Sequence, residues 1–198
     1  MGFGSFGDKT GTVWSYVGTE TDLYLVTADA VTPKGTGYAA NSSSEWSFAS
    51  VDDMVAATNI IDGLQVADLG LTGNFAAVPA APNAQVAWGA NESLFLGNQD
   101  LGFNHKVSWS AAGDITDWVP NVTTGAGEQE LPKAFGPITG GYGGLYSTIF
   151  QERGITRATY VGGDLIYRFE TMDETKGLIA TNSLVPVARE AFFLSQEG

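Results

Sequence analysis

Few side chains in this sequence have the chemistry of a catalytic or metal-binding group. His105 is the only histidine and cysteine is absent, so two histidines cannot share a metal ion and no thiolate site can form. A serine-protease-like triad would likewise have His105 as its sole candidate base. We expect His105 to be a surface loop residue, and we expect neither a metal ion nor a cofactor.

A pair of carboxylates offers the next candidate chemistry. Asp114 and Asp117 lie four and one residues before Trp118 in the segment WSAAGDITDW, which begins at Trp109. Two nearby carboxylates can perform acid–base catalysis. Aspartates in a short turn also accept hydrogen bonds from backbone amides two or three residues further on. The spacing around Thr116 favours the second role, so we predict a structural turn rather than a catalytic pair.

Other acidic and glycine-rich stretches give weaker signals. The pairs Asp52-Asp53 and Asp173-Glu174 could bind a hard cation, but no EF-hand spacing surrounds them, and we expect solvated turns. The glycine run at 140–144 lacks the Lys-Ser/Thr pair and the helix start of a phosphate loop. We therefore expect it to be a flexible connection.

Composition favours an all-β protein. The chain has 198 residues, 26 of them glycine, with 12% aromatic and only 16% charged residues, a balance typical of strands and turns. Alternating apolar residues and turn signals predict antiparallel sheets in a single β-rich domain over 1–198, with a weaker boundary near 84–93. The expected strands cover residues 12–17, 23–27, 54–59, 64–69, 86–88, 93–97, 106–111, 145–150, 155–161, 165–170 and 190–195.

The chain is strongly acidic, with a net charge of −13 from 22 acidic and nine basic residues. This argues against a surface that holds nucleic-acid phosphates. An acidic surface serves solubility, and it would also repel DNA that has to slide past it. No apolar run approaches the roughly 20 residues of a membrane-spanning helix, so we expect no membrane span.

Three segments carry a resemblance to a known family. WSAAGDITDW, TIFQERGITRATYVGGDLIYRFE and the terminal FFLSQEG resemble the nozzle, or tail tubular protein B, family of short-tailed bacteriophages. The similarity is strong over the second half of the chain and weak over the first. It implies a noncatalytic virion protein of the phage tail, assembled in the host cytoplasm, with antiparallel sheets arranged as blades of a β-propeller.

The resemblance also implies partners. These are further copies of the chain in a hexameric ring, an adaptor or portal-side ring, tail fibres, and viral DNA passing through the channel. Gln151, Glu152 and Arg153 match a segment that recurs at a blade hairpin, so they are expected to form a structural turn and a candidate interface. Members of the family continue beyond the point matching Gly198, so we expect more chain or a partner subunit to complete the roughly three or four blades counted here.

Two other functions stay open from the sequence. One is a glycan-binding or glycan-cleaving propeller, in which Arg153, Arg157 and Arg168 would converge on a substrate beside Tyr160 and Glu152. The other is a protein-interaction propeller of a host cell. Large aromatic residues do not separate these functions, because tryptophans such as Trp46 and Trp88 are more often core than ligand platforms.

Overall fold

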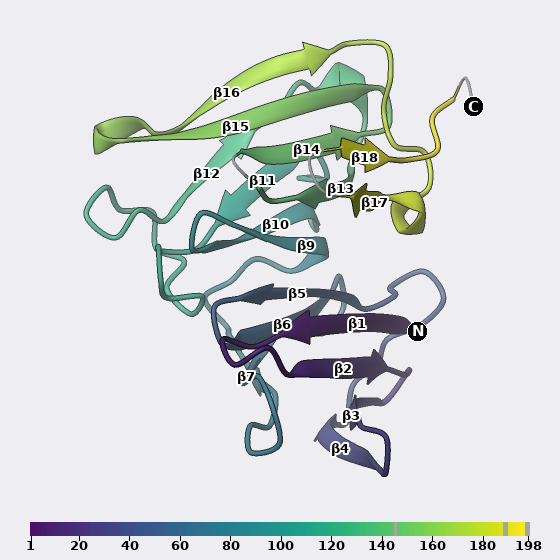
Figure 1. Cartoon of the computed structure of the whole chain (residues 1–198). Coiled ribbons are helices and arrows are strands. Elements are labelled where there is room, and N and C mark those ends of the chain that lie inside the picture. Colours follow the sequence, from purple (N-terminus) through teal and green to yellow (C-terminus); the bar gives the residue numbers. More distant parts are fainter. Residues whose placement is uncertain (145, 188–189, 197–198) are drawn as a thin grey trace.

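The computed structural model describes residues 1–144, 146–187 and 190–196, and these form antiparallel sheets that follow one another along the chain (Figure 1). Within every four-stranded sheet, consecutive strands are neighbours. The first sheet contains β1 (Gly2–Gly7), β2 (Val13–Gly18), β3 (Asp22–Val26) and β4 (Val31–Thr36). The second contains β5 (Ser47–Val51), β6 (Met54–Asn59), β7 (Gly63–Asp68) and β8 (Ala76–Ala77). The expected all-β, antiparallel class is confirmed.

Two more four-stranded sheets and a hairpin complete the described chain. The third sheet contains β9 (Ala84–Ala90), β10 (Ser93–Gln99), β11 (Lys106–Trp109) and β12 (Gly127–Glu130). The fourth contains β13 (Ile138–Tyr142), β14 (Ser147–Gln151), β15 (Gly154–Gly162) and β16 (Ile166–Asp173), and β17 (Val185–Val187) pairs with β18 (Glu190–Phe192). Short 3-10 turns lie at η1 (Lys133–Phe135), η2 (Gly163–Leu165) and η3 (Thr181–Ser183).

Polar side chains close the hairpin turns. Between β6 and β7, the Asn59 side-chain oxygen accepts hydrogen bonds from the amides of Ile61 and Asp62, at 2.8 and 2.7 Å. Gly63 then adopts a φ of 69°, which glycine tolerates without steric cost. The strands expected at 54–59 and 64–69 therefore form a hairpin across this Asp-Gly turn.

The sheets pack face to face in the order of the sequence. Their first strands are neighbours, because β5 contacts both β1 and β9, and β9 also contacts β13. One apolar cluster fills each space between consecutive sheets. Tyr16 and Val55 meet between the first and second sheets, Leu64 and Leu94 belong to the cluster between the second and third, and Trp88 belongs to the one between the third and fourth. The side chains of Trp46, Trp88, Trp109 and Trp118 are all buried, which confirms their expected place in the core.

The glycine run at 140–144 was expected to be a flexible connection, and this prediction was wrong for its first three residues. They belong to β13, which follows β12 and η1 along the chain. This strand was missed because glycines carry no side chains and so show no alternation of polar and apolar residues. The glycines allow the neighbouring sheet to pack closely. A Cβ on Gly141 would lie 2.5 Å from the Trp88 ring. The structure also adds β1 and β4, whose glycine and proline content masked their strand character.

Two further expectations are changed by the structure. His105 is 3% exposed, not a surface residue, because its ring is enclosed beside Glu130 at the start of β11. The segment expected to be a buried strand at 190–195 forms the short β18, and its Phe192 is 60% exposed. The third sheet begins at Ala84, near the weaker boundary expected at 84–93, and β9 with the turn into β10 covers these residues. Residue 145, the first of an expected strand, and Gly198 lie outside the described residues.

Candidate functional site

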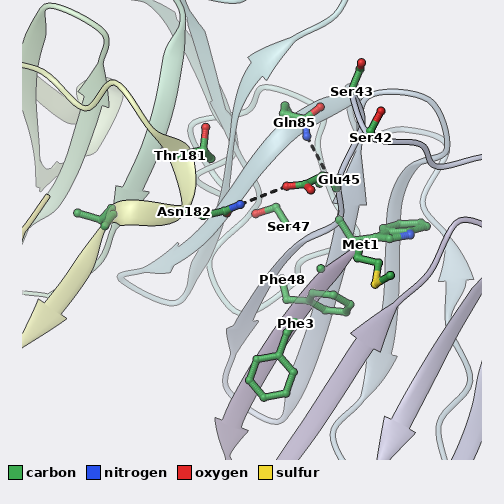
Figure 2. Close-up of a pocket in the computed structure, with 13 residues that line it drawn as sticks. Met1, Phe3, Ser42, Ser43, Glu45, Ser47, Phe48, Gln85, Thr181 and Asn182 are labelled. Atoms are coloured by element: carbon green, nitrogen blue, oxygen red, sulfur yellow. Dashed lines mark hydrogen bonds between the residues drawn. The ribbon is translucent and has the colours of Figure 1, made fainter. Parts of the chain in front are cut away.

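A groove of about 660 Å³ lies on the described part of the chain. It is bordered by the start of β1, the segment that leads into β5, the start of β9 and the 3-10 turn η3 (Figure 2). Three sheets and the C-terminal segment therefore meet at this place.

One wall of the groove is polar. The amide of Asn182 donates a hydrogen bond to the Glu45 carboxylate at 3.1 Å, across 137 positions of sequence (Figure 2). Gln85 donates through Nε2 to the backbone carbonyl of Glu45 at 3.0 Å, and the Ser47 hydroxyl accepts the amide of Ala87 at 3.0 Å. Through these contacts Glu45 joins the C-terminal segment to the second and third sheets.

Another wall is apolar. Phe48 lines it (Figure 2), and the neighbouring Phe3, which is 67% exposed, lies on the other face of β1. Trp46 also lines the groove with 4% exposure, and its Nε1 donates to the carbonyl of Thr19 at 2.8 Å. Its ring requires a glycine at position 18, because a Cβ there would clash with the Trp46 ring. The Trp46 ring is therefore held closely against β2.

The groove is lined mainly by uncharged side chains. Among the described residues that line it, Glu45 is the only one with an acidic or basic side chain. The lining instead supplies hydroxyl, amide and aromatic groups, which suit the binding of a polymer or a protein segment. Sequence reasoning missed this site because its members come from four distant segments.

The predicted turn motif lies elsewhere, after β11. The amide and the hydroxyl of Thr116 donate to Asp114 Oδ1 at 2.9 and 2.6 Å, and the amide of Val119 donates to Asp117 Oδ1 at 3.1 Å. These bonds, chiefly the one from the Thr116 hydroxyl, hold the pKa of Asp114 below its usual value. Trp118 is 7% exposed and donates to the carbonyl of Ile115 at 2.9 Å.

Trp109 anchors the other end of this motif. It lies on β11 with 4% exposure, and its Nε1 donates to the carbonyl of Gly125 at 2.8 Å. The motif thus ties the β11–β12 connection to the core on both sides. Its carboxylates are engaged in turn hydrogen bonds.

The segment Gln151-Glu152-Arg153 forms the turn between β14 and β15. Gln151 is fully buried, and its amide donates to the carbonyls of Pro132 and Gly136 at 3.1 and 2.7 Å. Arg153 is exposed and donates through Nε and Nη2 to the carbonyl of Ala134 at 3.2 and 3.0 Å. Gln151 therefore acts within the chain, and the exposed Arg153 is the member that a neighbouring molecule can reach.

The three arginines considered for glycan chemistry do not converge. Arg157 contacts Glu170 at 2.9 Å and Arg168 contacts the same carboxylate at 3.7 Å. Their charges and the hydrogen bond from Arg157 lower the pKa of Glu170. Arg153 instead binds the 3-10 turn before β13. This arrangement lacks the arginine cluster that a sialidase-like site would need.

The described residues contain no group of three or more His, Cys, Asp or Glu side chains placed to hold a metal ion. They also contain no helix of the length and hydropathy needed to cross a membrane. In comparison with known proteins, the chain matches no protein-family model and no curated protein sequence.

Proposed function

We propose that this chain is a noncatalytic wall subunit of a short phage tail, of the nozzle type, and that its sheets are blades of a β-propeller. The observation that carries the proposal is the packing of four consecutive four-stranded sheets, with their first strands β1, β5, β9 and β13 next to one another in chain order. Propeller blades have this connectivity. The hairpin of β17 and β18 follows as the beginning of a fifth blade.

The outer face of the first sheet supports a role in an assembly. Phe3, Val13 and Val31 are 67%, 67% and 63% exposed. Phe3 is paired with Val17, and Val31 with Val26, so these apolar residues lie on one face of the sheet. The opposite face packs on the second sheet through Tyr16, among other residues. An apolar sheet face open to solvent is typical of a contact surface.

The chemistry of the chain fits a passive wall. The net charge of −13 gives a field that repels DNA, which favours sliding over adhesion. The groove beside Glu45 lacks a second acidic or basic side chain among the described residues. In this proposal the subunits surround a channel for the viral DNA, and the resemblance to the nozzle family suggests six copies together with an adaptor ring and tail fibres.

Electron microscopy of the tail particles that contain this chain tests the proposal. We expect a symmetric ring with the sheets around an axial channel. Val31→Asp places a charge on the free face of the first sheet and is expected to prevent ring assembly without unfolding the chain. Leu101→Asp, at an 89% exposed loop position, is the matched control. Closed monomers in the microscope, or normal rings with Val31→Asp, would contradict the proposal.

A further inference from the structure

A second, smaller cavity of about 120 Å³ lies where the third and fourth sheets meet. Its walls come from Ser93 at the start of β10, from Thr124 in the loop before β12, and from Tyr160, Ile166 and Tyr167 of the β15–β16 hairpin. At about 30 Å³ per molecule of liquid water, it has room for about four waters. No acidic or basic side chain is among the described residues that line it.

Two residues that line this cavity have buried polar groups without partners. The hydroxyls of Tyr167 and Thr124 have no hydrogen-bond partner among the residues that the structure describes. Burial raises the pKa of Tyr167, while the polar side-chain groups of Ser93 and Asn91, which lie within reach of its hydroxyl, lower it. These groups are thus close to the Tyr167 hydroxyl, but no hydrogen bond of acceptable geometry reaches it. Unsatisfied buried groups of this kind call for an occupant that bonds to them.

The protein cannot relieve this arrangement by turning the Tyr167 ring away. Tyr167 is 2% exposed, and its ring packs edge-on against Phe95 and Trp109, each at a centroid distance of 5.2 Å. The preceding residue, Ile166, is held at a φ of 54°, a backbone conformation that β-branched residues rarely adopt. Core packing therefore fixes the Tyr167 hydroxyl at the cavity.

The mouth of the cavity has an aromatic side. Tyr160 is 57% exposed, and its ring lies 5.5 Å from that of Tyr167, its cross-strand partner. An exposed aromatic ring offers an apolar surface on which the C–H face of a ring-shaped ligand can pack. The cavity thus combines one aromatic wall with neutral hydrogen-bonding groups at its inner end.

We propose that this cavity binds one edge of a neutral sugar ring. Adjacent sugar hydroxyls both donate and accept, so they can bond to both the Tyr167 and the Thr124 hydroxyl. A charged ligand would be buried without a counter-charge, and a purely apolar one would leave both hydroxyls unsatisfied. The inference is independent of the tail role, because it needs only the β15–β16 hairpin and its neighbours in the third sheet.

The test uses the full chain with glucose, galactose and N-acetylglucosamine as separate probes, followed by saturation-transfer NMR and calorimetry. We expect saturable millimolar binding of at least one sugar. Tyr167→Phe removes only the hydroxyl and should weaken that binding about tenfold, and Thr124→Val should act in the same direction. Tyr142→Phe, at a tyrosine of β13 that does not line the cavity, is the matched control and should leave binding unchanged.

Folding does not obscure the result, because Tyr167→Phe deletes a group that has no partner. Without sugar, this variant should unfold at the same temperature as the unsubstituted chain or at a higher one. Absence of binding by all three sugars would mean that the cavity holds water alone and would overturn the proposal. Binding that survives both Tyr167→Phe and Thr124→Val would place the sugar elsewhere, for example beside Glu45, and would overturn it as well.

Discussion

The indole ring of Trp88 on β9 lies directly against Gly141 on β13, so a Cβ at position 141 would come within 2.5 Å of two ring atoms. The same indole donates through Nε1 to the hydroxyl of Ser147 on β14, at 2.8 Å. One side chain of the third sheet is thereby fixed by two strands of the fourth. Trp88 also stacks on Phe95, with ring centroids 5.6 Å apart. This contact sets how closely the two sheets approach, and two variants can test it.

Gly141→Ala should destabilise the chain by about 1–3 kcal/mol, because the added methyl group forces the Trp88 ring or the β13 backbone to shift. Urea denaturation measures the change. Gly144→Ala is the matched control from the same glycine run, since the nearest atom to its Cβ would be 4.0 Å away. Equal stability of the two variants would show that the ring does not pack as described.

Ser147→Ala should also destabilise by about 1–3 kcal/mol, because it leaves the buried indole N–H of Trp88 without its acceptor. Both side chains are almost inaccessible to solvent, with 4% exposure for Trp88 and 0% for Ser147. Ser5→Ala breaks a hydrogen bond to Ser15 at an exposed place and should change stability by less than about 0.5 kcal/mol. A loss no larger for Ser147→Ala than for Ser5→Ala would contradict the assigned bond.

The sequence predicted those strands whose apolar residues alternate. Residues 54–59 match β6, because a buried face and a turn at Asp62-Gly63 leave a clear signal. β13 was missed because glycines occupy the positions that face Trp88 and Leu178. These positions therefore carry no apolar side chain that a sequence pattern could reveal. His105 was misplaced for a related reason. Its neighbours in sequence suggest a loop, but in the fold its Nε2 lies 3.4 Å from the carboxylate of Glu130 on β12.

The candidate sites were harder to predict than the strands. The turn hydrogen bonds of Asp114 and Asp117 follow from local spacing, so they could be predicted. The contact between Glu45 and Asn182 joins segments 137 residues apart, and no pattern in one sequence encodes such a meeting. The Tyr167 cavity depends in the same way on three separate segments. The residues of both sites become neighbours only through the packing of the sheets.

Gln151→Ala should cost about 1–3 kcal/mol of stability, because its amide is the donor to two carbonyls of the segment that contains η1. Arg153→Ala removes contacts that water can replace at an exposed position, and it should cost less than about 1 kcal/mol. Thermal and urea unfolding compare the two. Reversed effects would show that the exposed arginine, and not the buried glutamine, holds the turn together.

Stability should fall as the pH drops from about 4 to about 2. The hydroxyl of Thr10 and the indole of Trp14 donate to Asp8 and lower its pKa to about 2, against an unfolded value of about 3.9. A carboxyl with a lowered folded-state pKa stabilises the fold fully above its unfolded pKa, and this contribution disappears as the pH falls through the folded value. Hydrogen bonds from Thr175 and from the Lys176 amide lower the pKa of Asp173 in the same direction.

Asp8→Asn isolates the share of Asp8 in this acid sensitivity. Its side-chain oxygen can still accept hydrogen bonds, but it does not titrate, so the melting temperature of the variant should fall less steeply between pH 4 and pH 2 than that of the unsubstituted chain. Asp29→Asn, at an exposed position between β3 and β4, provides the control for the loss of one negative charge. Circular dichroism melts across this pH range measure both slopes. Equal slopes for Asp8→Asn and Asp29→Asn would mean that the bonds from Thr10 and Trp14 do not favour the ionised form, and the turn at Asp8 would then owe its shape to backbone geometry alone.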